Sequence, residues 1–245
     1  MADELHSIND GKSVVSRTYE ALLKYVNNPK RSGEKLPSEI ELSKQLKVSR
    51  TALRDALKKL ELEGYISRKR KTGTFINCNN YKLHGGLEKL RSITELIKTS
   101  GMRPGTIFSK YSTDNADNII SQKLGLADSS RVSIIERVRT ADDTPFCYEI
   151  SFVPISYFNQ EDYENFSGSL LSYLSEKKGL VVDHAVTYLN PYSSDDLISE
   201  KLSIKNNQLI MYIEQVHYSV DDEPIWYSRA FYRNDIIRFS LMRRL

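Results

Sequence analysis

The chain has little cysteine and no long apolar run, and these absences limit where it works. Cys78 and Cys147 are its only cysteines among 245 residues, and neither stands at metal-ligand spacing to the other or to a histidine. We therefore expect both to be structural. No signal peptide and no apolar run of membrane-spanning length is found, so the expected compartment is the reducing cytoplasm, without a membrane partner.

The chain also lacks the short motifs that mark common enzyme sites. It contains no nucleophile elbow, P-loop, dinucleotide fingerprint or metal-binding cluster. We expect no catalytic residue, no metal site and no cofactor.

Positive charge is concentrated at the N-terminal end. Residues 1–76 hold 16 Lys and Arg against 10 Asp and Glu, a net charge of +6, whereas residues 77–245 hold 19 against 22, a net charge of −3. A chain of this length has room for two modest domains, each with its own core. The basic N-terminal part is expected to meet DNA.

The stretch 36–76 has the pattern of a helix-turn-helix followed by a two-stranded wing. Ser38 and Glu41 form an S-x-x-E capping box that begins a short helix. After a turn, Ser49 caps a second helix over 50–63. The apolar stripe of this second helix, at helical spacing, is Leu53, Ala56, Leu57 and Leu60.

The exposed flank of the second helix carries groups suited to reading base edges. They are Arg50, Thr51, Arg54 and Lys58. Two β-prone runs, 65–68 and 74–76, surround a basic turn at 69–73 and predict the wing. Taken alone, helix 50–63 is also compatible with an ordinary amphipathic core helix. The order of cap, turn, second cap, stripe and basic hairpin favours DNA binding.

The segments around this stretch set the predicted domain boundaries. Residues 1–12 are polar and expected to be flexible. An apolar stripe from Val15 to Val26 predicts a helix that stops before Pro29 and packs under the recognition helix. Residues 78–90 lack periodicity and are expected to be a linker between a DNA-binding domain, 13–77, and a second domain, 91–245.

The second domain contains an internal repeat. IISQKLGL at 119–126 recurs as LISEKLSI at 197–204, an offset of 78. IERV at 135–138 answers IEQV at 213–216, and DDTP at 142–145 answers DDEP at 221–224 after a one-residue insertion. Each copy reads as helix, strand, Asp-rich turn and returning strand. Two copies are too few for a solenoid, so we expect a pseudo-symmetric α+β domain with antiparallel hairpins.

Two cationic features of the second domain predict an anion site. Ser92 and Glu95 form another capping box, so Ser92, Ile93 and Thr94 present N–H groups at a helix N-terminus. Arg137 and Arg139 lie two residues apart on a strand.

The arginines therefore share a face of that strand. A three-residue turn at 142–144 would place Glu149 opposite Arg137, where it is available for hydroxyls or an amine. The alternative is that Arg137 and Glu149 merely form a cross-strand pair and that Ser92 merely caps a helix.

Residues 13–77 resemble the winged helix of GntR-family bacterial transcription regulators. The resemblance rests on LPSEIELSKQLKVSRTALRDALKKLELEGYISRKRKTGTFI, residues 36–76. It implies DNA contacts at Ser38, Ser49, Arg50, Thr51, Arg54, Arg70, Lys71, Thr72, Gly73 and Thr74. Ile40 stands where the family usually has Arg, so one contact is expected to be missing. Lys71 replaces the first glycine of the wing, which either tightens phosphate binding or alters how the tip enters the minor groove.

Residues 91–240 resemble the UTRA effector domain of the HutC branch of that family. The resemblance rests on SITELIKTSGMRPG at 92–105, IERVRTADDTPFCYEISFVP at 135–154 and EPIWYSRAFYRNDIIRF at 223–239. It implies a mostly antiparallel sheet flanked by helices, similar in fold to chorismate lyase, that binds a small molecule and forms a homodimer. It also implies effector contacts at Ser92, Ile93, Thr94, Arg137, Arg139, Glu149, Ser169 and Tyr232.

One departure from the effector-domain pattern bears on the ligand. Trp226 stands where members that sense sugar phosphates carry Glu, so a hydroxyl acceptor is absent and the ligand is expected to be less sugar-like. The expected function is a repressor whose two winged helices are repositioned on an inverted-repeat operator when a small anionic effector binds. The alternative is an enzyme on the lyase-like fold, which turnover of a candidate ligand would reveal.

Overall fold

The computed structural model describes residues 13–26, 28, 31–69, 72–77, 83–87 and 89–241. Arg70, Lys71 and Cys78, with residues 1–12 and part of the predicted linker, lie outside these. The chain divides into two compact units, one of residues 1–89, 99–101 and 238–245 and one of residues 90–98 and 102–237. Among the described helices, none has the length and apolar character needed to cross a membrane.

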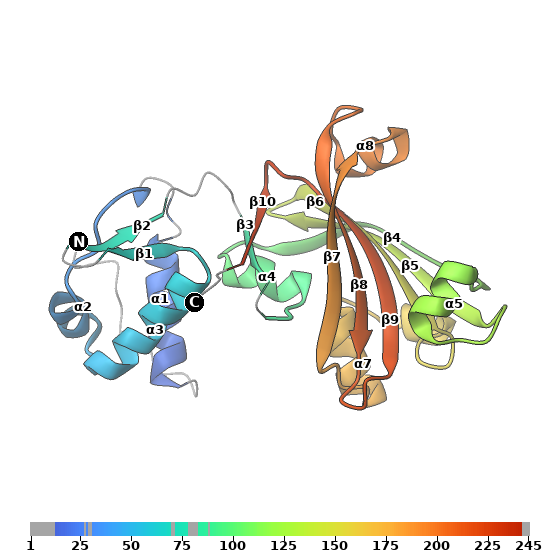
Figure 1. Cartoon of the computed structure of the whole chain (residues 1–245), viewed down its shortest axis with the longest axis horizontal. Helices are drawn as coiled ribbons and strands as arrows, with labels where there is room; N and C mark the ends of the chain where they lie inside the picture. Colours follow the sequence, from blue (N-terminus) through green and yellow to red (C-terminus); the bar gives the residue numbers. More distant parts are fainter. Residues whose placement is uncertain are drawn as a thin grey trace. The chain divides into compact units, whose positions relative to one another are not determined.

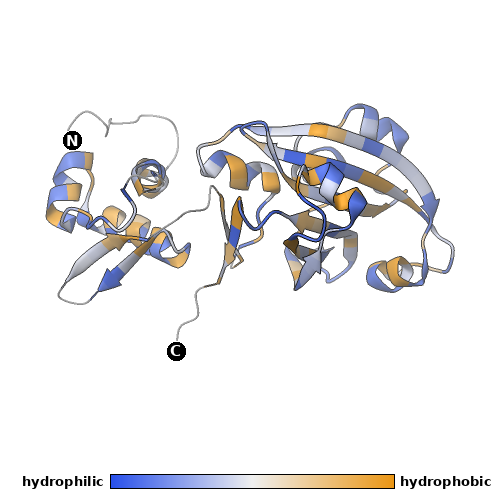
Figure 2. Cartoon of the chain, turned by 90° about the horizontal axis from the view of Figure 1, so that it is seen from above, coloured by the Kyte–Doolittle hydropathy of each residue, from blue (hydrophilic) through white to orange (hydrophobic). Residues whose placement is uncertain are grey.

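The first unit contains the predicted helix-turn-helix and wing (Figure 1). Its helices are α1 (Val14–Val26), α2 (Glu39–Leu46) and α3 (Arg50–Leu62). Its hairpin strands are β1 (Ile66–Lys69) and β2 (Gly73–Ile76), which pair antiparallel. Helices α1 and α3 pack together, and Leu22, Leu53 and Leu57 are almost fully buried between the elements of this unit. Each helix here carries both hydrophobic and hydrophilic residues (Figure 2).

Side-chain caps fix where α2 and α3 begin. The Ser38 hydroxyl accepts from the Glu41 amide, and the Glu41 carboxylate accepts from the Ser38 amide at 2.8 Å, so the capping box is confirmed. The Ser49 hydroxyl accepts from the Ala52 amide at 3.2 Å. Lys47 adopts a left-handed conformation, with φ of 54°, and ends α2. These caps satisfy helix-end N–H groups that have no partner within the helix.

One segment of the predicted linker is structured. Residues Leu83–Gly86 form strand β3, which pairs with β10 (Ile237–Ser240) in a separate two-stranded sheet. The sequence analysis did not predict this strand. It carries two glycines and no apolar alternation, so its partner near the end of the chain left no local signal.

The second unit is built on a six-stranded antiparallel sheet with the order β4-β5-β6-β9-β8-β7. Its strands are β4 (Pro104–Asn115), β5 (Arg131–Ala141), β6 (Thr144–Pro154), β7 (His184–Ser193), β8 (Leu209–Tyr218) and β9 (Pro224–Tyr232). Its helices are α4 (Ile93–Thr99), α5 (Asn118–Leu124), α6 (Gln160–Glu164), α7 (Leu170–Lys178) and α8 (Asp196–Leu202).

The internal repeat is confirmed by the strand order. The unit β4-α5-β5-β6 recurs as β7-α8-β8-β9, and the two copies join where β6 pairs with β9. Asp117 caps α5 and Asp195 caps α8 through the same contact, a side-chain oxygen that accepts the amide three residues on. The leading strands β4 and β7 also belong to the repeat, although sequence similarity did not reveal them.

Helices cover the two faces of this sheet in different ways. On one face, α5 and α8 each pack a small apolar cluster against β6, β8 and β9. On the other face, Leu170 and Leu174 of α7 pack against Ile135, Val153 and Trp226. This second face also bears the candidate site.

The turn between β5 and β6 differs from the prediction. Asp142 and Asp143 form a two-residue turn, with φ of 47° and 65°, rather than the three-residue turn predicted. A register shift between Arg139 and Thr140 adds one residue back. Arg137 therefore still pairs with Glu149, as predicted. Paired positive φ values suit the twist of a tight hairpin.

Candidate functional site

The candidate site of the second unit lies on one face of the sheet near its centre. Arg137 on β5 pairs with Glu149 on β6, and Glu149 pairs with Ala230 on β9. In the next row of that face, Arg139 pairs with Cys147, and Cys147 pairs with Tyr232. Paired residues of neighbouring strands point to the same side, so these side chains share one face.

A cavity of about 70 Å³ lies over this face. All of the residues that the sequence suggested for an effector line it, namely Ser92, Ile93, Thr94, Arg137, Arg139, Glu149, Ser169 and Tyr232. Three separate segments supply them: the sheet, the start of α4 and the start of α7. The structure therefore brings together residues that are far apart in the sequence.

The two arginines converge on a single backbone carbonyl. Arg137 Nη1 donates to Gly168 O at 2.9 Å, and Arg139 Nη1 donates to the same oxygen at 3.1 Å. Arg137 Nη2 also donates to Glu149 Oε2 at 3.0 Å, and Arg139 Nη2 donates to Thr94 Oγ1 at 2.7 Å. The Gly168 oxygen thus sits where two cations meet, as a small anion would.

The electrostatic balance of the cavity is positive. Its charged lining residues are Arg91, Arg137, Arg139 and Glu149. Arg137 and Arg139 are 4% and 2% exposed. Burial, followed by the neighbouring charge of Arg137, lowers the pKa of Arg139, although arginine remains a cation in proteins. Arg137 Nε is buried and has no hydrogen-bond partner among the described residues.

The sequence analysis did not identify Gln215, His217 and Ser228, which line the cavity, or Gly168, whose carbonyl accepts from both arginines. The repeat held the signal for two of them. The offset of 78 that relates IERV to IEQV maps Arg137 onto Gln215 and Arg139 onto His217. Gly168 contributes only its carbonyl, which no side-chain pattern reveals.

His217 and Trp226 form a flat wall on the β8–β9 side of the cavity. Their rings stack with centroids 3.7 Å apart and planes 15° apart. Burial lowers the pKa of His217 to about 3, against a smaller raising effect of the Trp226 backbone. His217 is therefore neutral at physiological pH.

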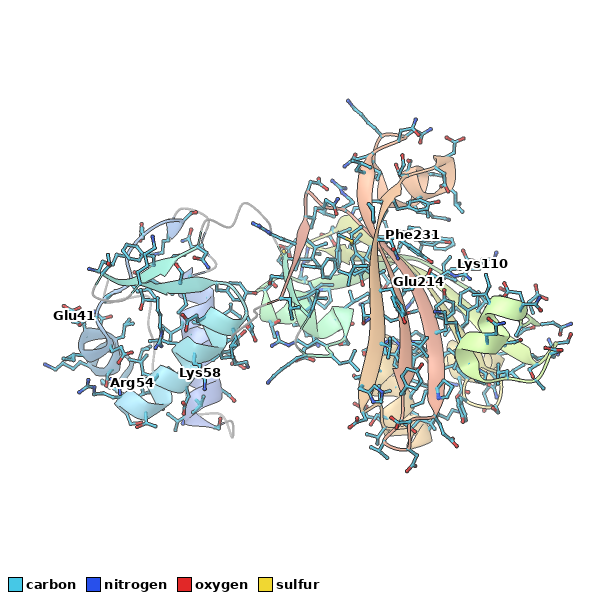
Figure 3. The ribbon with its side chains drawn as sticks, in the orientation of Figure 1. Glu41, Arg54, Lys58, Lys110, Glu214 and Phe231 are labelled. Atoms are coloured by element: carbon cyan, nitrogen blue, oxygen red, sulfur yellow. The ribbon has the colours of Figure 1, made fainter. Side chains whose placement is uncertain are left out.

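The first unit presents the predicted recognition helix. Arg50 and Thr51 are exposed at the start of α3. Arg54 and Lys58 project from the same helix (Figure 3). The Arg54 side chain is 57% exposed, and its Nε donates to Glu39 Oε2 at 2.7 Å. Glu39 thus holds Arg54 against α2 in the absence of DNA.

The wing and the start of α2 border a groove. The predicted contacts that line it are Ser38, Thr72, Gly73 and Thr74, beside Lys35 and Lys69. Gly73 has φ of 120°, a backbone conformation that favours glycine. Ile40 is 53% exposed, which leaves an apolar side chain where an arginine is usual.

Comparisons with known proteins agree with this architecture. The UTRA domain family matches residues 99–238, and the family of bacterial regulatory proteins called gntR matches residues 16–76. The HTH-type transcriptional repressor NagR of Bacillus subtilis is 28% identical over 83% of this chain and 83% of its own length. The mannosyl-D-glycerate transport/metabolism system repressor MngR of Escherichia coli is 23% identical over 86% of this chain and 88% of its own.

A solved structure supports the fold. The crystal structure of PhnF from Mycobacterium smegmatis superposes with a TM-score of 0.63 at 24% identity, covering 92% of this chain and 99% of that one. Family and relatives are transcription regulators and not enzymes. The chain belongs to the GntR family, in the group that carries a UTRA domain, and is a DNA-binding transcription regulator.

Proposed function

We propose that this regulator is a cytoplasmic repressor that leaves or shifts on its operator when a small phosphorylated or carboxylated metabolite binds the cavity. The observation that carries the proposal is the convergence of Arg137 and Arg139 on the Gly168 carbonyl, at 2.9 and 3.1 Å. Two buried guanidiniums that share one partial negative charge form a stronger site for a full anion. The amides of Ser92, Ile93 and Thr94 add donors beside it.

The Gly168 carbonyl links this anion site to α7. An anion that takes over both guanidiniums displaces the carbonyl from between them. Gly168 has φ of 81° and directly precedes Ser169, whose hydroxyl caps α7 by accepting from the Ser172 amide at 3.2 Å. Displacement therefore moves the start of α7, which is the change that the effector would impose first.

The remaining effector assignments follow from position. Glu149 Oε1 accepts from the Ser151 hydroxyl at 3.3 Å and Oε2 accepts from Arg137 at 3.0 Å, and each oxygen has a further lone pair that is able to accept from a ligand hydroxyl or amine. Ser169 and Tyr232 line the same cavity from α7 and β9. We assign all three to the uncharged part of the effector.

We also propose which residues contact DNA. Arg50, Thr51 and Arg54 stand on the exposed flank of α3 and are proposed to read bases in the major groove. The other predicted residues are proposed to contact the phosphate backbone or the minor groove of the DNA. They are Ser38, Ser49, Arg70, Lys71, Thr72, Gly73 and Thr74. Arg70 and Lys71 rest on the sequence alone.

Inorganic phosphate is the simplest probe of the anion site. We expect phosphate to raise the thermal unfolding temperature of the full-length protein more than that of an Arg139→Gln variant, because a ligand bound only to the folded state stabilises it. Phosphate also strengthens burial nonspecifically, so the difference between the two proteins is the informative quantity. Equal increases in both proteins would remove the anion site from the proposal.

We further propose that the second unit makes a homodimer. Two linked winged helices gain effective concentration on an inverted repeat, which a single small DNA interface does not provide. A fragment from about residue 87 onward is expected to sediment as a dimer at micromolar concentration. A monomeric fragment beside a dimeric full-length protein would place the interface on the winged helices.

A further inference from the structure

The two copies of the internal repeat make two chemically different halves of the cavity. Arg137 and Arg139 on β5 form one half, and their equivalents Gln215 and His217 on β8 form the other. The register preserves this equivalence, since Arg137 pairs with Glu149 and Gln215 pairs with Ser228. A single pseudo-symmetric face thus carries cations on one side of its centre and neutral polar groups on the other.

The neutral half holds a buried polar atom that has no hydrogen-bond partner among the described residues. His217 is 5% exposed, and its Nδ1 is buried without a hydrogen-bond partner among the described residues. Ser228 is 4% exposed and lines the cavity in the same half. Buried polar groups without hydrogen-bond partners are rare, because such a group loses its hydrogen bonds to water and gains none within the protein. Both residues line the cavity, so a ligand there is able to supply the missing partner.

The protonation state of His217 limits which ligand group it is able to bind. A neutral imidazole offers one N–H donor and one bare nitrogen acceptor, and its pKa of about 3 keeps it neutral. The ring cannot neutralise a second anionic group without taking up a proton at a cost. The charged groups that line the cavity are Arg91, Arg137, Arg139 and Glu149, and none of them lies on β8 or β9 beside His217.

We propose that the effector carries one anionic group at one end and an uncharged hydrogen-bonding group, a hydroxyl or an amide, at the other, held by His217 and Ser228. This inference rests on the proposed anion site at Arg137 and Arg139. It excludes bisphosphates and dicarboxylates whose charges lie at opposite ends, because the second charge would be buried without a partner. His217 is then a specificity-determining residue.

The test uses full-length protein and calorimetric titration with defined probes. They are inorganic phosphate, a panel of monophosphates and monocarboxylates with a hydroxyl or amide at the far end, and the matching bisphosphates and dicarboxylates. The tightest ligand is expected to be singly anionic and to bind more tightly than phosphate. His217→Phe keeps a flat ring against Trp226 and removes both nitrogens. It should weaken that ligand by about tenfold more than it weakens phosphate.

Two further variants keep the result interpretable. Ser228→Ala removes one small polar group and should also weaken the panel ligand more than phosphate, even if His217→Phe folds poorly. His184→Phe is the matched control, since His184 stacks on Tyr218 with centroids 5.1 Å apart and does not line the cavity. It should bind every probe as the parent does.

Three results would overturn the inference. The first is that a doubly anionic compound binds most tightly. The second is that no compound of the panel binds more tightly than phosphate. The third is that His217→Phe and Ser228→Ala weaken the binding of the panel ligand and of phosphate by the same factor. Failure of the parent to bind phosphate at all would reject the anion site instead, so the two failures are distinguishable.

Discussion

Arg137→Ala is expected to weaken effector binding by at least about tenfold, because charge-assisted hydrogen bonds contribute roughly 1.5–3 kcal/mol each. Arg137 is 4% exposed, lines the cavity, and donates hydrogen bonds to the Gly168 carbonyl and to Glu149. DNA affinity without effector should stay at the parent value, because the residue lies in the other unit. In cells the variant should be a repressor that no longer responds to its inducer. Calorimetric titration with the tightest ligand measures the effect.

Two controls separate loss of the site from loss of the fold. Arg103→Ala removes a guanidinium whose side chain is 77% exposed and paired with Asp143 at 2.6 Å, outside the cavity, and should bind as the parent does. Arg137→Ala also leaves Glu149 without its cation, so a double variant with Glu149→Gln removes the uncompensated carboxylate. If Arg137→Ala binds the ligand with unchanged affinity, the arginine is only the cross-strand partner of Glu149.

Arg54→Ala is expected to cost about 1–3 kcal/mol of operator binding and to relax preference at one base pair of each half-site. A guanidinium on the exposed flank of α3 is able to pair bidentately with guanine. Its ion pair with Glu39 must open first, but the side chain is 57% exposed, and pairs of this kind contribute little. Fluorescence anisotropy on operator DNA selected from a random pool, with single base substitutions, measures both quantities.

Glu39→Gln provides the matched control for this prediction. It weakens the contact that holds Arg54 in the free protein while leaving the guanidinium in place. Operator affinity should be retained or slightly improved. A uniform loss in Arg54→Ala across all DNA sequences would assign the residue to the phosphate backbone, and no loss would remove it from the interface.

Local chemistry in the sequence predicted the elements of the first unit. The Ser38 and Ser49 caps and the apolar stripe of α3 are short-range features, so each is visible in a few neighbouring residues. Strand β3 was missed because its partner, β10, lies about 150 residues further along the chain, and a glycine-rich strand has no alternation to reveal it. Pairing at such separation leaves no local trace.

Part of the candidate site was also predictable, because it depends on short-range patterns within one hairpin. Strand alternation placed Arg137 and Arg139 on one face, and hairpin register placed Glu149 opposite Arg137. The meeting of α4, α7 and the sheet depends on tertiary packing, which spacing does not encode. Gly168 acts through its backbone. His217 and Gln215 were accessible through the repeat, since their equivalents in the first copy are the arginines.

The central claim is that occupation of the cavity controls operator binding. The direct measurement is the affinity of full-length protein for selected operator DNA, with and without the tightest ligand of the panel, for the parent and Arg137→Ala. The parent should bind an inverted repeat and lose affinity as ligand is added, whereas the variant should bind equally under both conditions. A parent whose operator affinity does not respond to a ligand shown to bind it, or a variant that responds as the parent does, would contradict the account.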